Sequence, residues 1–384
     1  MNNNVLPGQF EGFADARKQG FIAVKNLKDA GKKVVGTFCT YAPVEIILAA
    51  GAVPVGICAF SDETIAEAEK VLPRNLCPLV KSSYGFAITD KCPYMFFADL
   101  IVGEMTCDAK KKMYELLAEI KNVHVMQIPQ TQCGETANEL WYKEVLLLKK
   151  KIEKEFGVVI TDESIKKAIR LKNEERGLLK EFYDLSKSCP PPITGAEQLK
   201  VLYGSQFKFD YEEKNRELRA TIDKVKLGYE NGVENVSATA KRILITGCPL
   251  AGVTEKIVTA VEGSGGVVVV YENCIGVKPA ELLVDENEEP YKAIADRYLQ
   301  IGCSVMTPNN NRYEILSRLV KEFRVDGVVE MTLQACHTYA IETTGIRKLM
   351  QKENVPFISV ETDYSTSDVA QLKTRIAAFI EMLP

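Results

Sequence analysis

Residues 241–248 are K-R-I-L-I-T-G-C and residues 266–274 are G-V-V-V-V-Y-E-N-C. Each stretch holds a short, largely β-branched apolar run, which is typical of a strand buried on both faces of a parallel sheet. Arg242–Thr246 and Gly266–Tyr271 are therefore predicted to be strands. Val253–Glu262, between them, has the pattern of a helix. Strand, helix and strand in this order predict an open α/β sheet.

The same alternation covers most of the chain. Six further strands are predicted, at Lys33–Phe38, Val53–Ile57, Asp99–Gly103, Val123–Ile128, Asp326–Met331 and Pro356–Val360. An acidic helix is predicted at Asp62–Val71. The middle of the chain is different, because Glu135–Leu185 is charged and helical with a break near Gly157, and a third long polar helix is predicted at Tyr211–Asn231. The three prolines after Cys189 form a stiff connector, since proline cannot continue a helix.

This pattern predicts an α/β fold with two flavodoxin- or Rossmann-like open parallel-sheet domains joined by a helical segment. The predicted boundaries are 1–134 for the N-terminal α/β domain, 135–240 for the helical connecting segment and 241–384 for the C-terminal α/β domain. In such sheets, ligands bind beyond the carboxyl ends of the strands.

Composition excludes several classes of protein. The 384 residues are 46% hydrophobic and 26% charged, which is the balance of a globular chain and not of a disordered one. The net charge of −4 argues against a nucleic-acid-binding protein, which needs a basic face. No apolar run approaches the roughly 20 residues of a membrane span. Met1–Val5 shows no basic start of a secretory signal, so we expect a cytoplasmic protein without a membrane partner.

Cysteine is the unusual residue of this sequence. There are 11 cysteines and only two histidines, and an odd number of thiols cannot all pair internally. Six cysteines follow the carboxyl ends of predicted strands, namely Cys39, Cys107, Cys133, Cys248, Cys274 and Cys336. Structural zinc sites contain close pairs, whereas no two cysteines here are closer than 15 positions. Ligands spread singly over many loops favour an iron–sulfur cluster between the domains. Any one thiol could equally be an ordinary buried residue.

Several segments carry a further likeness. In the first half they are T-F-C-T-Y-A-P-V-E-I-I-L-A-A-G-A-V-P-V (37–55), L-C-P-L-V-K-S-S-Y-G (76–85) and D-L-I-V-G-E-M-T-C-D (99–108). In the second half they are Y-E-N-C-I-G-V-K-P (271–279), C-S-V-M-T-P-N-N-N-R (303–312), D-G-V-V-E-M-T-L-Q-A-C-H-T-Y (326–339) and E-T-D-Y-S-T-S-D (361–368). In this order, over nearly the whole chain, they resemble the benzoyl-CoA reductase / 2-hydroxyacyl-CoA dehydratase family, and most closely its double-cubane cluster proteins.

The resemblance implies a cofactor and partners. Cys77, Cys107 and Cys336 match the three cysteines that hold a four-iron cubane in family subunits. The double-cubane branch carries two 4Fe-4S units bridged by a sulfide. Its members resemble homodimers served by an ATP-hydrolysing activator, itself an iron–sulfur protein. The activator would supply low-potential electrons under anaerobic conditions for the reduction of a small molecule, for which acetylene is a family surrogate.

The ligands of the second cubane remain a hypothesis. Cys39 and Cys133 lie at strand ends of the first domain. Cys248 would lie beside the strand that carries Cys336 if the strand order is flavodoxin-like. Cys274 and Cys303 compete with these three thiols.

Candidate catalytic residues lie beside the cysteines. His337 follows Cys336 and could donate a hydrogen bond or a proton. Glu45 and Glu330 could add negative charge or carry protons, although each could equally be a solvated or capping carboxylate. The same two interpretations apply to Glu104 and Glu361, and Tyr339 and Lys81 are weaker candidates.

The sequence therefore predicts an enzyme, an iron–sulfur oxidoreductase that depends on ATP through its partner. One alternative is a subunit of a 2-hydroxyacyl-CoA dehydratase with a single cubane. A second is a protein that stores electrons without catalysis, and a third is a metal-free α/β binding protein.

Overall fold

The computed structural model describes residues 15–248 and 253–384. Its first sheet has four parallel strands in the order β2-β1-β3-β4. Their bounds are Val53–Gly56, Val34–Thr37, Leu100–Glu104 and Val123–Met126. The strands are short and the central ones are buried on both faces, as expected for a parallel sheet that helices cover.

The second sheet repeats this order with β6-β5-β7-β8. Its strands are Gly266–Glu272, Lys241–Gly247, Gly327–Leu333 and Phe357–Thr362. All pairs in both sheets are parallel. The predicted fold class, with two parallel-sheet domains, is confirmed, and the strand order is flavodoxin-like in each.

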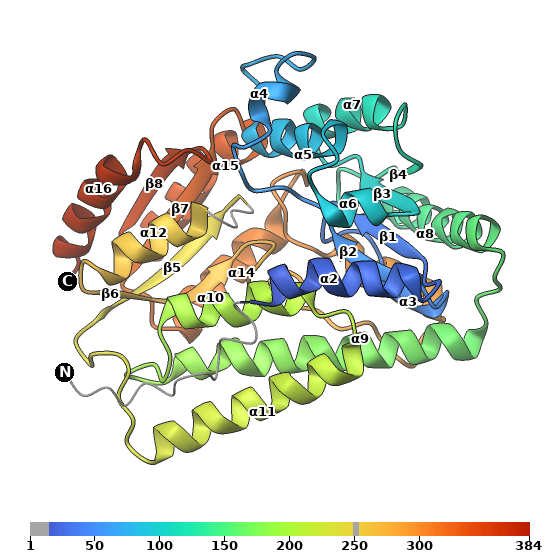
Figure 1. The fold of residues 1–384 in the computed structure, drawn as a ribbon. Helices are drawn as coiled ribbons and strands as arrows, with labels where there is room; N and C mark the ends of the chain where they lie inside the picture. Colours follow the sequence, from blue (N-terminus) through green and yellow to red (C-terminus); the bar gives the residue numbers. More distant parts are fainter. Residues whose placement is uncertain (1–14, 249–252) are drawn as a thin grey trace.

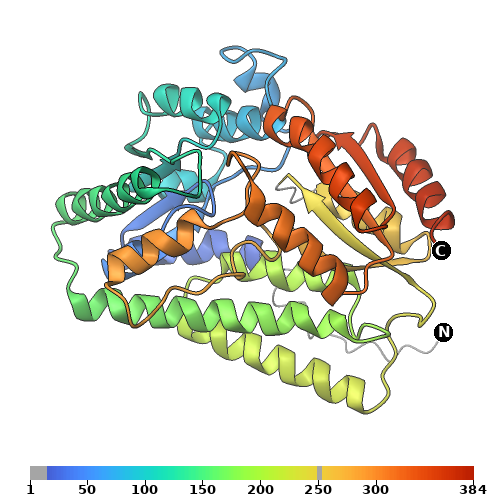
Figure 2. The same ribbon diagram turned by 180° about the vertical axis from the view of Figure 1, so that it is seen from behind.

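Helices cover both sheets (Figure 1). In the first lobe they are α2 (Ala16–Asp29), α3 (Val44–Ala49), α4 (Ile65–Ala68), α5 (Pro78–Ile88), α6 (Pro93–Phe97) and α7 (Asp108–Leu117). In the second they are α12 (Val253–Glu262), α13 (Pro290–Leu299), α14 (Asn310–Glu322), α15 (His337–Lys352) and α16 (Val369–Glu381). Figure 2 shows α14 and α15 on the face of the second sheet that lies opposite α12 and α16.

The helical segment consists of α8 (Glu135–Phe156), α9 (Asp162–Asp184), α10 (Gly195–Gly204) and α11 (Tyr211–Glu230), with the short 3-10 turns η1 (Leu185–Lys187) and η2 (Ser205–Phe207). Gly157 ends α8 in the left-handed conformation, with φ of 65°. The hydroxyl of Thr161 caps α9 through the backbone N–H of Ser164. Figures 1 and 2 show α9 and α11 running together beneath both lobes.

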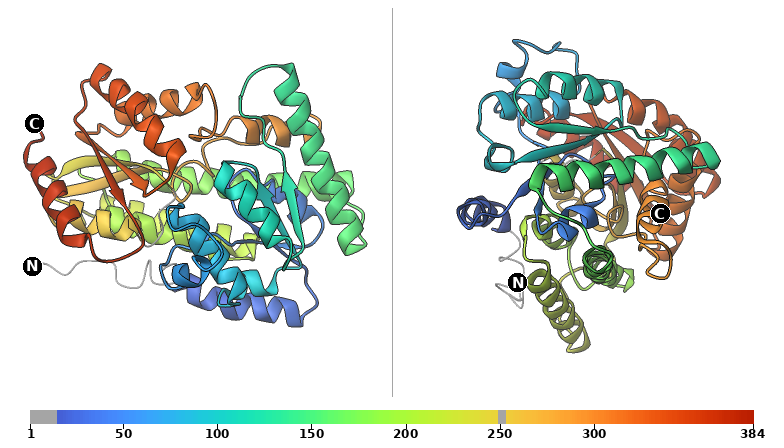
Figure 3. Two further views of the ribbon diagram at one scale, coloured as in Figure 1. Left: turned by 90° about the horizontal axis from the view of Figure 1, so that it is seen from above. Right: turned by 90° about the vertical axis from the view of Figure 1, so that its right-hand side faces the viewer.

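A segment of the second half returns to the first lobe. α13 packs against α8 and α9, and its Ile294 shares a hydrophobic cluster with Val35 of β1 and Trp141 of α8. The views in Figure 3 place α13 beside α8. The loop after α13 therefore carries Cys303 to the space between the lobes. Within the described ranges, every helix is too short or too polar to cross a membrane.

Candidate functional site

The carboxyl ends of strands from both sheets open onto one cavity of about 270 Å³. Seven thiols from the two lobes line it, namely Cys39, Cys58, Cys77, Cys107, Cys274, Cys303 and Cys336. All seven are free thiols. Four of them, Cys39, Cys107, Cys274 and Cys336, are among the cysteines expected after strand ends, because parallel strands that share a sheet end at the same edge.

Three of these cysteines are positioned by helix starts. Cys77, Cys107 and Cys336 are the residues that immediately precede α5, α7 and α15. Pro78 favours the start of α5, since its fixed φ suits the first helical position. The unpaired N–H groups and the dipole of a helix N-terminus favour a thiolate over a thiol.

Cys336 is the centre of a first group of thiols. The thiols of Cys248 and Cys77 donate hydrogen bonds to it, and these bonds lower the pKa of Cys336 to about 3. The same bonds, together with burial, raise the pKa of Cys77 and Cys248. Cys107 lies near enough to interact electrostatically with Cys336, and burial raises the pKa of its thiol. These hydrogen bonds favour the thiolate form of Cys336, which is the form that binds metals.

Cys248 reaches this group through a glycine. Gly247 has φ of +116°, and a Cβ at this position would lie 1.9 Å from the carbonyl oxygen of Met331. The backbone N–H of Cys248 donates to the Met331 carbonyl at 2.9 Å, and its Sγ accepts from the N–H of Leu333 at 3.3 Å. The end of β5 is therefore fixed against β7, as the flavodoxin-like order required.

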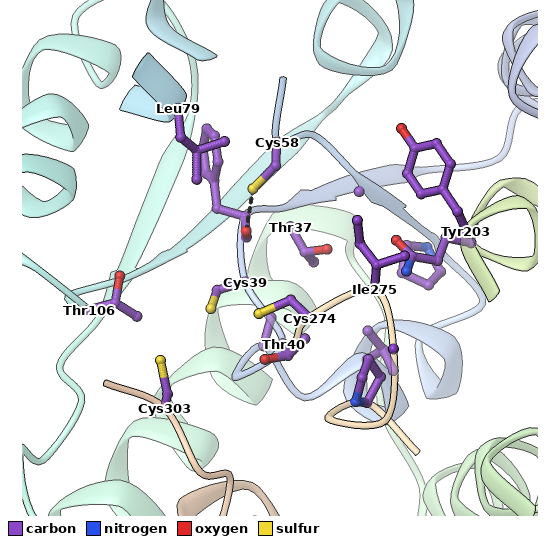
Figure 4. A pocket seen from close by; sticks show the side chains of 18 of the residues that line it. Thr37, Cys39, Thr40, Cys58, Leu79, Thr106, Tyr203, Cys274, Ile275 and Cys303 are labelled. Atoms are coloured by element: carbon purple, nitrogen blue, oxygen red, sulfur yellow. Dashed lines mark hydrogen bonds between the residues drawn. The ribbon is translucent and has the colours of Figure 1, made fainter. Parts of the chain in front are cut away.

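Cys39, Cys274 and Cys303 form a second group. Figure 4 shows their sulfur atoms directed into the same space, with Cys39 and Cys274 side by side. The thiol of Cys39 donates a hydrogen bond to Cys274, which raises the pKa of Cys39 and lowers that of Cys274. Burial raises the pKa of Cys303, against the lowering effect of the Lys278 ammonium. The fourth thiol on this side, Cys58, donates to the carbonyl of Phe38 at 2.6 Å.

The structure does not bring every predicted cysteine to the cavity. Cys39, Cys77, Cys107 and Cys336 line it, and Cys248 is buried behind Cys336. Cys133 is exposed and does not line the cavity, although it also follows a strand. Cys274 and Cys303, which competed with it in the sequence, do line the cavity.

The predicted catalytic residues lie apart from the thiols. Glu45 is fully buried and accepts hydrogen bonds from Arg176 at 2.6 Å and from the hydroxyl of Tyr298 at 2.9 Å. Burial alone would raise the pKa of Glu45, but Arg176 and Arg297 bring it below its usual range. Glu330 is buried within β7, where burial raises its pKa. None of the residues that line the cavity is Glu45, Glu330 or His337, and His337 is exposed.

Of the other candidate residues named from the sequence, one lines the cavity and three do not. Tyr339 lines the cavity, and its hydroxyl accepts a hydrogen bond from Lys278 at 3.0 Å. Glu104 is fully buried, and burial raises its pKa well above the usual range. Lys81 pairs with Glu69 at 2.8 Å, and Glu361 is exposed.

The donor set fits a polynuclear cluster. Among residues 15–248 and 253–384, no three His, Cys, Asp or Glu side chains are arranged around a single metal ion. An iron–sulfur cluster makes a different demand, because its iron atoms are held by separate cysteine thiolates on different sides of the inorganic core. Thiols that line one cavity from both lobes meet that demand.

Comparison with known proteins places these observations in a family context. The family model described as "2-hydroxyglutaryl-CoA dehydratase, D-component" matches residues 39–383. A protein of Escherichia coli K12 that carries the name of a dehydratase subunit, YjiM, is 53% identical over 98% of both chains. The (R)-phenyllactyl-CoA dehydratase beta subunit of Clostridium sporogenes is 24% identical over 94% of both chains. A subunit of the benzoyl-CoA reductase of Thauera aromatica is 21% identical over 94% of both chains.

Proposed function

The chain belongs to the 2-hydroxyglutaryl-CoA dehydratase D-component family, and from this premise we propose that it is an iron–sulfur reductase component that carries a double-cubane cluster. The observation that carries the proposal is the cavity lined by seven thiols. A single cubane held by three cysteines would leave four of these thiols without a ligand role.

The two groups of thiols suggest how the ligands are shared. We assign Cys77, Cys107 and Cys336 to one cubane, and Cys39, Cys274 and Cys303 to the other. This differs from the sequence-based hypothesis, in which Cys133 and Cys248 took part. Cys133 is exposed, and Cys248 is buried behind Cys336, to which it donates a hydrogen bond. We therefore propose that Cys248 is not an iron ligand and that it stabilises the thiolate of Cys336 by this hydrogen bond.

When bound, such a cluster stores and transfers electrons at low potential. The chain would contribute ligands, burial and electrostatics. Helix N-termini at Cys77, Cys107 and Cys336 favour the thiolate form of these ligands. Lys110 lines the cavity, where its ammonium lies 5.5 Å from the centroid of the Phe38 ring and interacts electrostatically with Cys39 and Cys58. Cations in this position compensate part of the negative charge that the thiolates carry.

The partners follow from the same proposal. The chain would act as a homodimer and would receive electrons from an ATP-hydrolysing activator, which is an iron–sulfur protein. Two of its relatives are named as subunits of enzymes, which supports a role together with other protein components. The substrate would be a small molecule, because the cavity of about 270 Å³ is slightly smaller than the roughly 300–1,000 Å³ that ligand sites enclose.

The test is an anaerobic purification followed by iron and sulfide analysis and electron paramagnetic resonance. The proposal expects about eight iron atoms per chain, two cubanes of about four each. It also expects reduction of acetylene once the activator and ATP are added. Iron without any turnover under these conditions would favour an electron-storing protein.

A second candidate function is favoured by the names of the relatives, three of which are CoA-ester dehydratase beta subunits. The chain would then be one subunit of a 2-hydroxyacyl-CoA dehydratase with a single cubane. About four iron atoms per chain, together with a requirement for a second subunit of the same fold, would support this candidate over the first.

A further inference from the structure

Besides the thiols, the cavity is lined by a wall of charged side chains that the proposed cluster does not require. The charged side chains that line the cavity are those of Lys110, Lys172, Glu175, Arg176, Lys214 and Arg297. Five of these carry positive charge and one carries negative charge. Lys110 lies near the thiols, whereas the others come from α9, α11 and α13.

One carboxylate serves two ammonium groups in this wall. Glu175 pairs with Lys214, whose Nζ lies 2.6 Å from Oε1, and with Lys172 through its other oxygen. Lys214 and Glu175 are 2% and 4% exposed. Burial lowers the pKa of Lys214 to about 8, although Glu175 opposes this effect. The three groups together carry one net positive charge in a buried place.

Of the two guanidinium groups in this wall, Arg176 is paired with the buried carboxylate of Glu45, whereas Arg297 repeats the imbalance. Arg176 donates to Glu45, Tyr298 and Asn173, but its Nε is buried and has no hydrogen-bond partner. Arg297 donates to the carbonyls of Pro279 at 2.6 Å and Leu282 at 2.9 Å. Among the described residues, no carboxylate forms an ion pair with Arg297.

A buried positive charge without a partner is costly, and an anionic ligand would remove that cost. Guanidinium groups match the planar, two-oxygen geometry of a carboxylate. The neighbouring lining is apolar and aromatic, with Leu202, Tyr203, Phe207 and Ile275. An inorganic anion would gain nothing from that surface, whereas the carbon skeleton of an organic acid would pack against it.

We propose that Lys172, Arg176, Lys214 and Arg297, called here the cationic wall, bind the carboxylate of a small organic acid in the same cavity as the thiols. The identification of the bound acid as the substrate rests on the proposed function. The binding of a carboxylate by the cationic wall does not rest on it, because the charges of the wall and the unpartnered Nε of Arg176 are present with or without a cluster.

The proposal is tested by isothermal titration calorimetry on the anaerobically purified, iron-loaded protein. The probes are propionate, benzoate and glutarate, each with its matching amide, and inorganic phosphate. At least one carboxylate is expected to bind at least tenfold more tightly than its amide and than phosphate. Failure of all three carboxylates to bind, or equal binding of phosphate, would overturn the proposal.

Variants locate the bound group. Arg297→Gln and Lys172→Gln are each expected to weaken carboxylate binding at least tenfold. Lys172→Gln is included because it is expected to fold even if the other variant does not. The side chain of Lys172 is 14% exposed, and Glu175 keeps its ion pair with Lys214 when Lys172 is replaced. Arg219→Gln is the matched control, since Arg219 lies on α11 with a side chain 50% exposed and pairs with Glu181. Full binding by both wall variants would overturn the proposal.

Iron content separates this inference from the proposed function. If the wild-type protein holds iron but binds no carboxylate, the cationic wall is wrong and the cluster proposal stands. If it binds a carboxylate but holds no iron, the wall stands and the proposed function fails.

Discussion

At the residue scale, a position after a strand does not by itself bring a cysteine to the cavity. Cys77, Cys107 and Cys336 each precede a helix and line the cavity. Cys133 also follows a strand, but Gly134, with φ of 99°, separates it from the start of α8, and its side chain is exposed. Cys336 and Cys133 therefore provide a matched comparison.

Cys336→Ser is expected to remove at least about half of the bound iron, because a hydroxyl does not replace a thiolate on iron. Cys133→Ser is expected to keep the full iron content. Iron per chain, measured on both anaerobic preparations, checks this. An unchanged iron content in the Cys336 variant would show that Cys336 is not an iron ligand.

The pair Cys303 and Cys248 distinguishes the two ligand hypotheses. Cys303→Ser is expected to lose about half of the iron, one cubane of two. Cys248→Ser is expected to keep most of it, since Cys248 supports Cys336 by a hydrogen bond. The opposite result, with iron lost only in the Cys248 variant, would restore the assignment made from the sequence.

Lys214 gives the cationic wall a pH dependence. It faces Glu175 and Lys172 of α9 and lies over the ring of Tyr211, whose centroid is 3.5 Å away. With its pKa lowered to about 8, Lys214 loses its proton as the pH rises through that value. Carboxylate binding is therefore expected to be constant below about pH 7 and to weaken above about pH 8. Calorimetry between pH 6 and about 9.5 checks this, and Lys214→Met is expected to abolish the change.

The sequence predicted the residues of the site only in part, for a physical reason. The rule that ligands gather at strand ends placed Cys39 and Cys107 at the edge of one predicted sheet and Cys248 and Cys274 at the edge of the other. This rule carries no information about burial, so it did not separate the partly buried Cys274 from the exposed Cys133. The cationic wall was invisible, because Lys172 and Lys214 are spaced as ordinary polar residues of surface helices.

At the element scale, the junction of β5 with β7 depends on Gly247. Because a Cβ there would meet the Met331 carbonyl at 1.9 Å, Gly247→Ala must push the strands apart. The left-handed φ alone costs about 1–3 kcal/mol for a residue other than glycine. We expect a clear loss of thermal stability, measured by scanning calorimetry.

The control for this variant is Gly177→Ala in α9. Nothing lies within 4 Å of a Cβ built on Gly177, and alanine stabilises a helix interior by about 0.5–1 kcal/mol relative to glycine. This variant is expected to be as stable as the parent or more so. A Gly247 variant of unchanged stability would show that the end of β5 is not fixed as described.

A buried ion pair joins α3 to α9. Arg176 and Glu45 are both fully buried, so Glu45→Ala leaves the guanidinium without its carboxylate. Removing one partner of a buried pair costs about 3–5 kcal/mol. The urea midpoint of this variant is expected to fall, whereas Glu139→Ala, which breaks the exposed pair with Lys143, is expected to leave it unchanged. A Glu45 variant of parental stability with low activity would instead support the catalytic role considered from the sequence.

Long elements were easier to predict than short ones. The break between α8 and α9 was expected at Gly157, and both helices have a clear periodic pattern. The predicted helix over 62–71 is a single turn, Ile65–Ala68. α10 was missed, although Thr194 and Glu197 form a capping box at its start.

At the scale of the whole molecule, the two sheets share one strand order, and their carboxyl ends meet at one cavity. The fold class was accessible from the sequence, because alternation and short apolar runs are local patterns. The flavodoxin-like strand order entered the sequence analysis only as a condition, and the structure supplied it. The return of α13 to the first lobe was not accessible from the sequence, since it depends on packing against α8 and α9. This return brings Cys303 to the cavity.

The central claim is that thiols from both lobes hold one iron–sulfur centre. Iron analysis of the anaerobic wild-type protein beside Cys77→Ser, from the first lobe, and Cys336→Ser, from the second, tests it most directly. The account predicts about eight iron atoms per wild-type chain and a loss of at least about half in each variant. A colourless wild-type preparation without iron, or full iron in both variants, would contradict it.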